Sequence, residues 1–426
     1  MIKKVKQKGY SLLRKSEKYT KTDMVYLVRG TSVLFNGQMW TSLSLFLAAV
    51  CFANFLPKEI YGNYKYVLSS AAIIGSFSLT GLNSAIKQSV ASGFTSSLNH
   101  GFRLSIKHSL LFFIISTGVS IYYFFHHNNL LGYGFLLVSI FQPIIQASEV
   151  YNAYLNGIKD FKKIAKNNIL RTTTVSIFII LITVFSGNVF YLLSIYFVGN
   201  MIISFILYKE QLNRNETNDN SQIDTGIISY SKHLSLSNAI SRLAFYLDNI
   251  LVFQFIGSAQ VAIYTIALAI PEQFKGLIKI QGSLAAPKLI KIENYSFLII
   301  KIIKMMLILI LPVGAYIFLA PTIFMLFFPK YLESIFITQI IAISVLFTTA
   351  IQQAAFEAKK EIKINYIFNI TSSIFRIVVL TSSIILGGLI GLAIGHTISR
   401  VFNFILSILL LIKMQKNSTS TQEAKD

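Results

Sequence analysis

Three arginines lie inside apolar stretches of the chain: Arg242, Arg376 and Arg400. An arginine left against hydrocarbon costs about 2.5 kcal/mol or more, so an arginine within a membrane segment usually faces an interior and has a function. The guanidinium group stays charged and offers a planar fork of donors that matches phosphate. These residues therefore predict a cavity that binds an anionic, phosphate-bearing ligand.

Other polar residues recur in the same stretches at spacings of about four, seven and eleven residues, which place them on one helix face. Such side chains either form hydrogen bonds between helices or line a hydrophilic cavity. Of these two alternatives, we predict the cavity, because it would place these side chains together with the arginines. The predicted cavity residues, besides the arginines, are Lys87, Asn83, Asn238, Asn249, Asn369 and Asn403.

Two acidic residues in the C-terminal part of the chain have two interpretations each. Asp248 either neutralises Arg242 on the same segment or takes part in ion coupling. Glu272 either pairs with Lys275 or Lys279, or has such a coupling role. An acid inside a membrane is costly without a partner or a bound cation, which is why both interpretations name one.

Glu149 and His396 complete the set of candidate coupling residues. Glu149 has no basic residue nearby on its own helix, so it either pairs across helices or binds a coupling cation. His396 is either a hydrogen-bonded interior histidine or a proton relay. Both H⁺ and Na⁺ stay open as the coupled ion.

The elements that position these residues are expected to be membrane-spanning helices. Hydrophobic residues make up 54% of the 426-residue chain and charged residues 13%, which is about half the charged fraction of soluble proteins. The apolar runs are continuous rather than alternating, which indicates helices and not barrel strands. We predict an all-α integral membrane protein with about twelve transmembrane helices. The second span is predicted over residues 66–86 and the tenth over 334–356.

The net charge of +21 would favour nucleic-acid binding in a soluble protein. Here the basic residues flank apolar runs, so they indicate membrane topology and no nucleic-acid partner. Lys and Arg gather in alternate connections, and the intervening connections hold only Lys58, Lys65 and Lys330. Both termini are therefore predicted to be cytoplasmic. The predicted cytoplasmic segments are a basic N-terminus (1–30), a flexible linker (209–233) and a tail (413–426).

The linker separates two stretches of six predicted spans, over 31–208 and 234–412. An offset of 200 residues aligns the two stretches, matching Phe55 with Phe255 and Tyr64 with Tyr264. Two six-helix halves repeated in parallel commonly enclose a central cleft and rock against each other. The repeat therefore predicts two halves that give alternating access to a shared cleft.

The sequence lacks the usual signatures of catalysis. Its single cysteine, Cys51, excludes an intrachain disulfide and a cysteine metal site. No G-x-x-x-x-G-K-[ST] phosphate-binding loop and no nucleophile–base arrangement occur in the sequence. We therefore predict no catalytic residue, no metal site, no cofactor and no enzymatic activity.

Three segments resemble a known group of membrane proteins. They are YLDNILVFQFIG (Tyr246–Gly257), LNGIKDFKK (Leu155–Lys163) and FFPKYLESIFITQIIAISVLF (Phe327–Phe347). With the six-plus-six layout, which covers essentially the whole chain, they resemble the O-antigen and capsule repeat-unit flippases (Wzx-type polysaccharide biosynthesis proteins). Those proteins belong to the multidrug/oligosaccharidyl-lipid/polysaccharide (MOP) superfamily, and the resemblance implies a MATE-like fold.

The resemblance also implies a function. Members of the group move undecaprenyl-pyrophosphate-linked oligosaccharide from the cytoplasmic to the periplasmic leaflet of the bacterial inner membrane. Arg242, Arg376 and Arg400 would hold the pyrophosphate, and asparagine side chains would bond sugar hydroxyls. Membrane lipids, polysaccharide polymerase and glycosyltransferases would be the partners.

Three other functions stay open. A cation-coupled multidrug exporter of the same superfamily would need an acidic cavity, whereas arginines outnumber unpaired acids near mid-span. A lipid II flippase would be essential to the cell. A membrane scaffold for glycan-assembly enzymes would keep its function after loss of every cavity charge.

Overall fold

The computed structural model describes residues 24–78, 81–94, 96–215, 227–289, 295–358 and 361–423, and every regular element within them is helical. We call α2 to α9 the N-half and α10 to α15 the C-half. The helices of the N-half are α2 (Met24–Phe55), α3 (Lys58–Ile74), α4 (Leu82–Ala91), α5 (Ser97–Phe125), α6 (Asn129–Ser148), α7 (Val150–Gly157), α8 (Phe161–Phe185) and α9 (Val189–Asn215). Those of the C-half are α10 (Ile227–Phe255), α11 (Ser258–Leu289), α12 (Tyr295–Phe327), α13 (Ser334–Ile343), α14 (Ala350–Ala358) and α15 (Ile362–Glu423).

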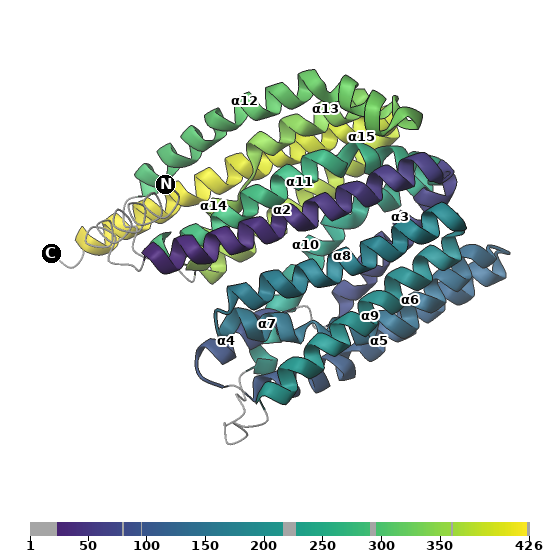
Figure 1. The fold of residues 1–426 in the computed structure, drawn as a ribbon. Helices are drawn as coiled ribbons and strands as arrows, with labels where there is room; N and C mark the ends of the chain where they lie inside the picture. The colour runs from purple at the N-terminus through teal and green to yellow at the C-terminus, as the bar shows by residue number, and fades with distance from the viewer. Residues whose placement is uncertain are drawn as a thin grey trace, which may run out of the picture.

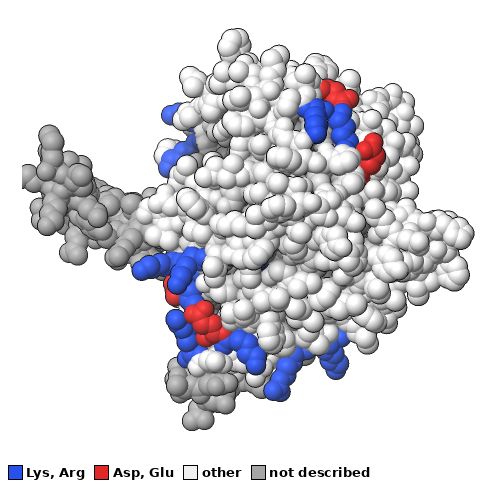
Figure 2. All heavy atoms as spheres, turned by 45° about the vertical axis from the view of Figure 1, so that its right-hand side comes forward, with Lys and Arg blue, Asp and Glu red and all other residues white. Residues whose placement is uncertain are grey.

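Nine helical segments of the described residues are long and apolar enough to cross a membrane. Figure 2 shows charged side chains at the margins of one face and a broad uncharged surface between them, as a lipid-facing surface requires. The last segment, Lys363–Gln415, is 53 residues long and breaks at Gly387 and Gly388. Gly388 has a φ of +55°, which glycine adopts without strain. The prediction of an all-helical, multi-pass membrane protein is therefore confirmed, whereas the number of about twelve spans stays a prediction.

The helix boundaries recur at the offset of 200 residues found in the sequence. Helix α2 ends at Phe55 and α10 at Phe255, and the next helices begin at Lys58 and Ser258. Each half also has a glycine break before its last long helical stretch, at Gly187 and at Gly387–Gly388. Corresponding positions of the two halves can therefore be compared residue by residue.

Several helices extend beyond the predicted spans or are interrupted within them. The linker predicted over 209–233 is helical at both ends, and residues 216–226 lie outside the described residues. The predicted N-terminal segment and tail overlap helices, because α2 begins at Met24 and α15 continues to Glu423. The predicted spans 66–86 and 334–356 are interrupted, between Ile74 and Leu82 and between Ile343 and Ala350. Hydropathy does not detect such breaks because Gly, Ser and Thr interrupt a helix without changing its mean polarity much.

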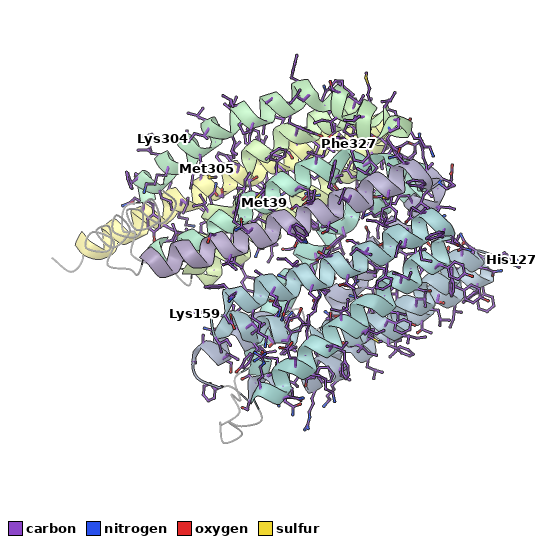
Figure 3. The ribbon with its side chains drawn as sticks, viewed as in Figure 1. Met39, His127, Lys159, Lys304, Met305 and Phe327 are labelled. Atoms are coloured by element: carbon purple, nitrogen blue, oxygen red, sulfur yellow. The ribbon has the colours of Figure 1, made fainter. Side chains whose placement is uncertain are left out.

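The two ends of the molecule are packed differently. Figure 3 labels His127 and Phe327 at one end and Lys159 and Lys304 at the other. At the first, which we call the joined end, one apolar core contains buried residues of both halves. At the opposite end, which we call the split end, the described residues form separate cores, one in the N-half and one in the C-half. Figure 1 shows the halves side by side, with the start of α2 and the end of α15 at the split end.

Close packing and polar contacts connect the halves at the joined end. Gly62 of α3 lies so near Ser258 of α11 that a Cβ at Gly62 would be 1.7 Å from the Ser258 carbonyl oxygen. Lys58, at the start of α3, forms an ion pair with Glu333, which precedes α13. Lipid provides no hydrophobic drive for helices to associate, so contacts of these two kinds hold the halves together.

Candidate functional site

Asp248, on α10, is the centre of a buried polar network in the C-half. Its carboxylate accepts hydrogen bonds from Nη2 of Arg376 at 2.8 and 3.0 Å and from the Tyr264 hydroxyl at 2.7 Å. Nδ1 of His396 lies 3.0 Å from the same carboxylate. Arg376 also donates from Nε to the backbone oxygen of Ala244 at 2.8 Å. A buried charge needs partners on every side, and this network supplies them.

The network corrects one pairing considered from the sequence. Asp248 pairs with Arg376, 128 residues away in the chain, and not with Arg242. Arg242 and Asp248 are six residues apart on α10, which places them on different sides of the helix. The Arg242 side chain is exposed. Of the two interpretations of His396, the contact with Asp248 matches the hydrogen-bonded interior histidine.

A second group of charges lies on α11 and on the second part of α15. Lys275 is buried and forms an ion pair with Glu272, which is one of the pairings predicted. Arg400 lies within electrostatic range of both residues. Its Nε is buried and has no hydrogen-bond partner among the described residues. A desolvated, unbonded polar group costs about 1–3 kcal/mol, so this nitrogen is a point where a ligand oxygen would be stabilised.

The N-half contributes an ion pair between Glu149 and Arg171, whose charged atoms are 2.5 Å apart. This contact is the cross-helix alternative for Glu149, which follows α6 and faces α8. Sequence reasoning missed Arg171 because it counted the residue with a cytoplasmic connection. The available signal is a spacing of four residues along α8, from Lys163 through Asn167 to Arg171, which places all three on one face.

Charged residues of both halves lie at the same depth. At 1.5 Å per residue, Arg171, Arg242, Glu272 and Arg400 are each roughly 16–21 Å from the joined-end terminus of their helix. This depth is near the middle of a hydrocarbon core about 30 Å thick. The Tyr246 hydroxyl, on α10, lies within electrostatic range of Arg242, Glu272 and the N-half residue Glu149. We call the set the central charged layer, and it consists of Glu149, Arg171, Arg242, Tyr246, Glu272, Lys275 and Arg400, together with Lys279, which lies about two helical turns closer to the split end.

The central charged layer has an excess of positive charge. Its two carboxylates are paired, Glu149 with Arg171 and Glu272 with Lys275. Arg242, Lys279 and Arg400 form no ion pair within the part of the chain that the structure describes. Uncompensated cations between low-dielectric walls attract anions and repel cations. The layer is therefore suited to an anionic ligand.

The predicted asparagines are distributed over several environments. Asn249 donates to Ser69 at 2.8 Å and so connects α10 with α3 of the other half. Asn369 donates to Asn365 on its own helix at 3.3 Å. Oδ1 of Asn403 is buried and has no partner among the described residues. The first two contacts match the helix-to-helix or local hydrogen bonding considered as the alternative to a cavity.

The remaining predicted residues lie away from the central charged layer or outside the description. Asn83 is half-buried and Lys87 is exposed, both on α4 near the split end. The side chain of Asn238 lies outside the described residues. Of the predicted cavity cations, Arg242 and Arg400 thus lie in the layer, and Arg376 lies beside it in the Asp248 network.

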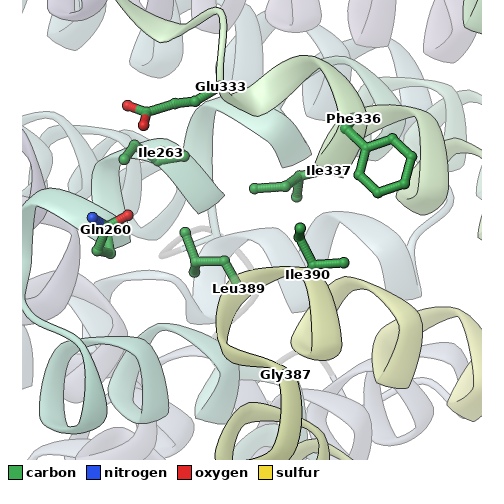
Figure 4. Close-up of a pocket in the computed structure, with 8 residues that line it drawn as sticks. All are labelled: Gln260, Ile263, Glu333, Phe336, Ile337, Gly387, Leu389 and Ile390. Carbon is green, nitrogen blue, oxygen red and sulfur yellow. The ribbon is translucent and has the colours of Figure 1, made fainter.

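Two hollows on the C-half lack the charges of this layer. Figure 4 shows one of about 290 Å³ at the joined end, where Gln260, Glu333 and Gly387 lie at the meeting of α11, α13 and the break in α15. The other, of about 340 Å³, is almost wholly apolar and is lined by residues such as Ile340 and Phe402. No group of His, Cys, Asp and Glu residues within the described ranges is arranged to hold a metal ion.

A family model described as polysaccharide biosynthesis protein matches residues 27–278. None of the curated proteins matches the chain in sequence. The fold is similar to that of the lipid II flippase MurJ in an inward closed conformation, with a TM-score of 0.67, 15% identity and coverage of 91% of each chain. It is also similar to an outward-facing multidrug resistance MATE family transporter of the MOP superfamily, with a TM-score of 0.67, 16% identity and coverage of 93% of this chain and 96% of that one.

A third similar structure is a MOP superfamily transporter from Pyrococcus furiosus, with a TM-score of 0.60 and 14% identity. The match covers 92% of this chain and 96% of that one, and its title reports a binding pocket of reverse polarity. At such low identity these likenesses show the fold. The predicted MATE-like arrangement is therefore confirmed.

Proposed function

The chain belongs to the polysaccharide biosynthesis protein family, whose model covers more than half of it, and we propose that it is a flippase for lipid-linked oligosaccharide. The substrate is an undecaprenyl-pyrophosphate-linked repeat unit of O-antigen or capsule, moved from the cytoplasmic to the outer leaflet of the bacterial inner membrane. The fold shared with MurJ and MATE transporters supports a transport role and not an enzymatic one.

The excess positive charge of the central charged layer is the observation that carries this proposal. A pyrophosphate cannot cross hydrocarbon without compensation of its charge. Arg242 and Arg400 supply two cations near mid-membrane, and Lys279 supplies a third closer to the split end; none of the three forms an ion pair with a described carboxylate. Arg376 has a supporting role in this scheme, because Asp248 already occupies its guanidinium group.

The difference between the two ends of the molecule supports alternating access. The halves share a core at the joined end and have separate cores at the split end. Basic residues are frequent in the connections of the split end, which favours a cytoplasmic position for that end and for both chain termini. The substrate headgroup enters between the halves there, and release requires the contacts at the joined end to part.

The finer organisation follows the same scheme. About twelve spans are divided between the two halves, with their junction at residues 216–226. Glycosyltransferases supply the substrate and a polysaccharide polymerase consumes the product.

For coupling to H⁺ or Na⁺, Glu149 is the favoured residue, because the oxygens of Asp248 are occupied by donors and Glu149 is partly exposed. Glu272, which also has one ion-pair partner and a partly exposed side chain, is the second candidate, whereas His396 is buried against Asp248.

The test is transport in reconstituted liposomes, with labelled undecaprenyl-pyrophosphate-linked oligosaccharide and a leaflet-resolved readout. Arg400→Ala should lower the initial rate about tenfold or more, because a hydrogen bond to a charged group is worth about 1.5–3 kcal/mol. Asn200→Ala, at the corresponding position of the N-half, is the matched control and should transport normally. Full transport by both Arg400→Ala and Arg242→Ala would contradict the proposal. Export of a cationic dye instead of the lipid would favour the multidrug alternative, and preference for lipid II would favour the cell-wall alternative.

A further inference from the structure

The ion pair between Glu149 and Arg171 differs from the rest of the central charged layer in being neutral as a pair and partly open. Its side chains are 37% and 23% exposed, respectively. Within the described residues, the contact between them is the only hydrogen bond that either side chain makes. A carboxylate accepts through two oxygens and a guanidinium group has five N–H donors. Most of the hydrogen-bonding capacity of the pair is therefore left for a ligand.

Three tyrosine hydroxyls approach this pair from three different helices. They belong to Tyr151 on α7, Tyr196 on α9 and Tyr246 on α10, and each lies within electrostatic range of Glu149. None of the three hydroxyls bonds to a described residue. The hydroxyl of Tyr151 is also fully buried. Buried hydroxyls nearly always have a partner, so the Tyr151 hydroxyl is suited to a partner other than the described chain. Tyr196 and Tyr246 are half-buried, and their hydroxyls are available to the same ligand.

We infer that Glu149, Arg171, Tyr151, Tyr196 and Tyr246 form a carbohydrate-binding subsite, to which the N-half contributes all residues but Tyr246. Sugar hydroxyls both donate and accept, and this set offers a carboxylate acceptor, guanidinium donors and hydroxyls that do either. The tyrosine rings add an apolar body next to each hydroxyl. A phosphate fits less well, because the carboxylate of Glu149 cancels the charge of Arg171.

The subsite and the cations of the C-half can bind two parts of one headgroup at the same time. Arg171 and Arg400 lie at the same depth, and the Tyr246 hydroxyl is in electrostatic range of both Glu149 and Glu272. This inference rests on the proposed function and divides its substrate between the halves. The pyrophosphate binds to the C-half, and the sugar next to it binds to the N-half.

The experiment measures binding of two matched lipids to the purified protein. The probes are undecaprenyl pyrophosphate that carries one N-acetylglucosamine and the same lipid without sugar. Tyr246→Phe should raise the Kd for the sugar-bearing probe about tenfold and leave the Kd for the sugar-free probe unchanged. Glu149→Gln should raise the Kd for the sugar-bearing probe relative to that for the sugar-free probe, because it removes a sugar acceptor and uncovers the charge of Arg171 for the pyrophosphate. Arg400→Ala should weaken both probes alike. Tyr133→Phe, at an exposed tyrosine of the joined end, is the matched control and should change neither value.

Equal changes in the Kd values of both probes with Glu149→Gln and Tyr246→Phe would overturn the subsite, and so would no change in either. Tyr246→Phe removes a single oxygen with no described partner, so it tests the subsite without disturbing the fold. If the wild-type protein binds neither lipid, the proposed function fails. The subsite is then judged on free chitotriose, whose binding must still be lowered by Glu149→Gln and by Tyr246→Phe for the inference to stand.

Discussion

The two halves carry different chemistry at corresponding positions of the same helical framework. Four charged or titratable residues of the C-half, Asp248, Arg376, His396 and Arg400, have neutral counterparts at the offset of 200, which are Ala48, Ser176, Tyr196 and Asn200. One half therefore has a buried ionic network where the other has neutral side chains. The framework is set by apolar residues and helix breaks, and a few substitutions decide what each half can bind.

One conserved contact shows that the correspondence is structural. In the C-half, the Tyr264 hydroxyl lies 3.4 Å from Nδ1 of His396. In the N-half, the rings of Tyr64 and Tyr196 are in edge-to-face contact, with centroids 6.1 Å apart. The same two positions touch in both halves, through a polar contact in one and an aromatic contact in the other. The difference fits an anion site in the C-half and a neutral, aromatic site in the N-half.

The largest effect is expected from removing the ionic partner in the C-half. Arg376→Met would leave the Asp248 carboxylate buried and unpaired, which typically costs about 3–5 kcal/mol. Ser176→Ala, at the corresponding position, should cost far less. Thermal unfolding of the purified protein in detergent measures both. Similar losses of stability in the two variants would contradict the contrast between an ionic C-half and a neutral N-half. If Asp248→Asn added to Arg376→Met restores part of the lost stability, the unpaired carboxylate is the cause of the loss.

A smaller loss of stability is expected from replacing His396, which also contacts Asp248. His396→Phe removes the contact to Asp248, and loss of a hydrogen bond to a charged group costs about 1.5–3 kcal/mol. Tyr196→Phe should leave stability unchanged, because its hydroxyl bonds to no described residue. Unfolding midpoints of the two variants check this, and a larger loss for Tyr196→Phe would reverse the assignment of the ionic network to the C-half.

The contact between the halves can be tested at Gly62. Gly62→Ala would place a methyl group against the Ser258 backbone, and overpacking of this kind typically costs about 1–3 kcal/mol. The joined end should open more often as a result. The measurement is disulfide formation between cysteines placed at Lys58 and Glu333, which should slow in the Gly62→Ala background. An unchanged rate would mean that this contact does not hold the halves together.

The smallest effect is expected at the ion pair of the joined end. The side chains of Lys58 and Glu333 are 32% and 51% exposed, and exposed pairs contribute about 0–1 kcal/mol. Lys58→Glu should therefore lower the unfolding midpoint slightly at low salt and hardly at all at high salt. The double variant Lys58→Glu with Glu333→Lys should recover the wild-type value. A loss that persists in the double variant would exclude a charge effect.

Much of the fold could be predicted because it depends on local properties of the chain. Continuous apolar runs require helices in lipid, and the match of Phe55 with Phe255 already indicated the repeat. The breaks inside spans were missed, as between Ile74 and Leu82, because they barely change hydropathy. The same reasoning singled out Arg242 and Arg400, which lie on α10 and on the second part of α15. It overlooked Arg171, since the apolar run begins next to this residue, whereas α8 begins ten residues earlier, at Phe161.

The amino-acid sequence by itself determined that the protein is a helical membrane protein, and it indicated a repeated framework and arginines within apolar stretches. The tertiary structure decided which charges are neutralised. Asp248 pairs with Arg376 across 128 residues, while Arg400 keeps a buried nitrogen without a described partner. The physical reason is range: helix formation and membrane insertion depend on neighbouring residues, whereas a buried charge is compensated by whichever helix packs against it.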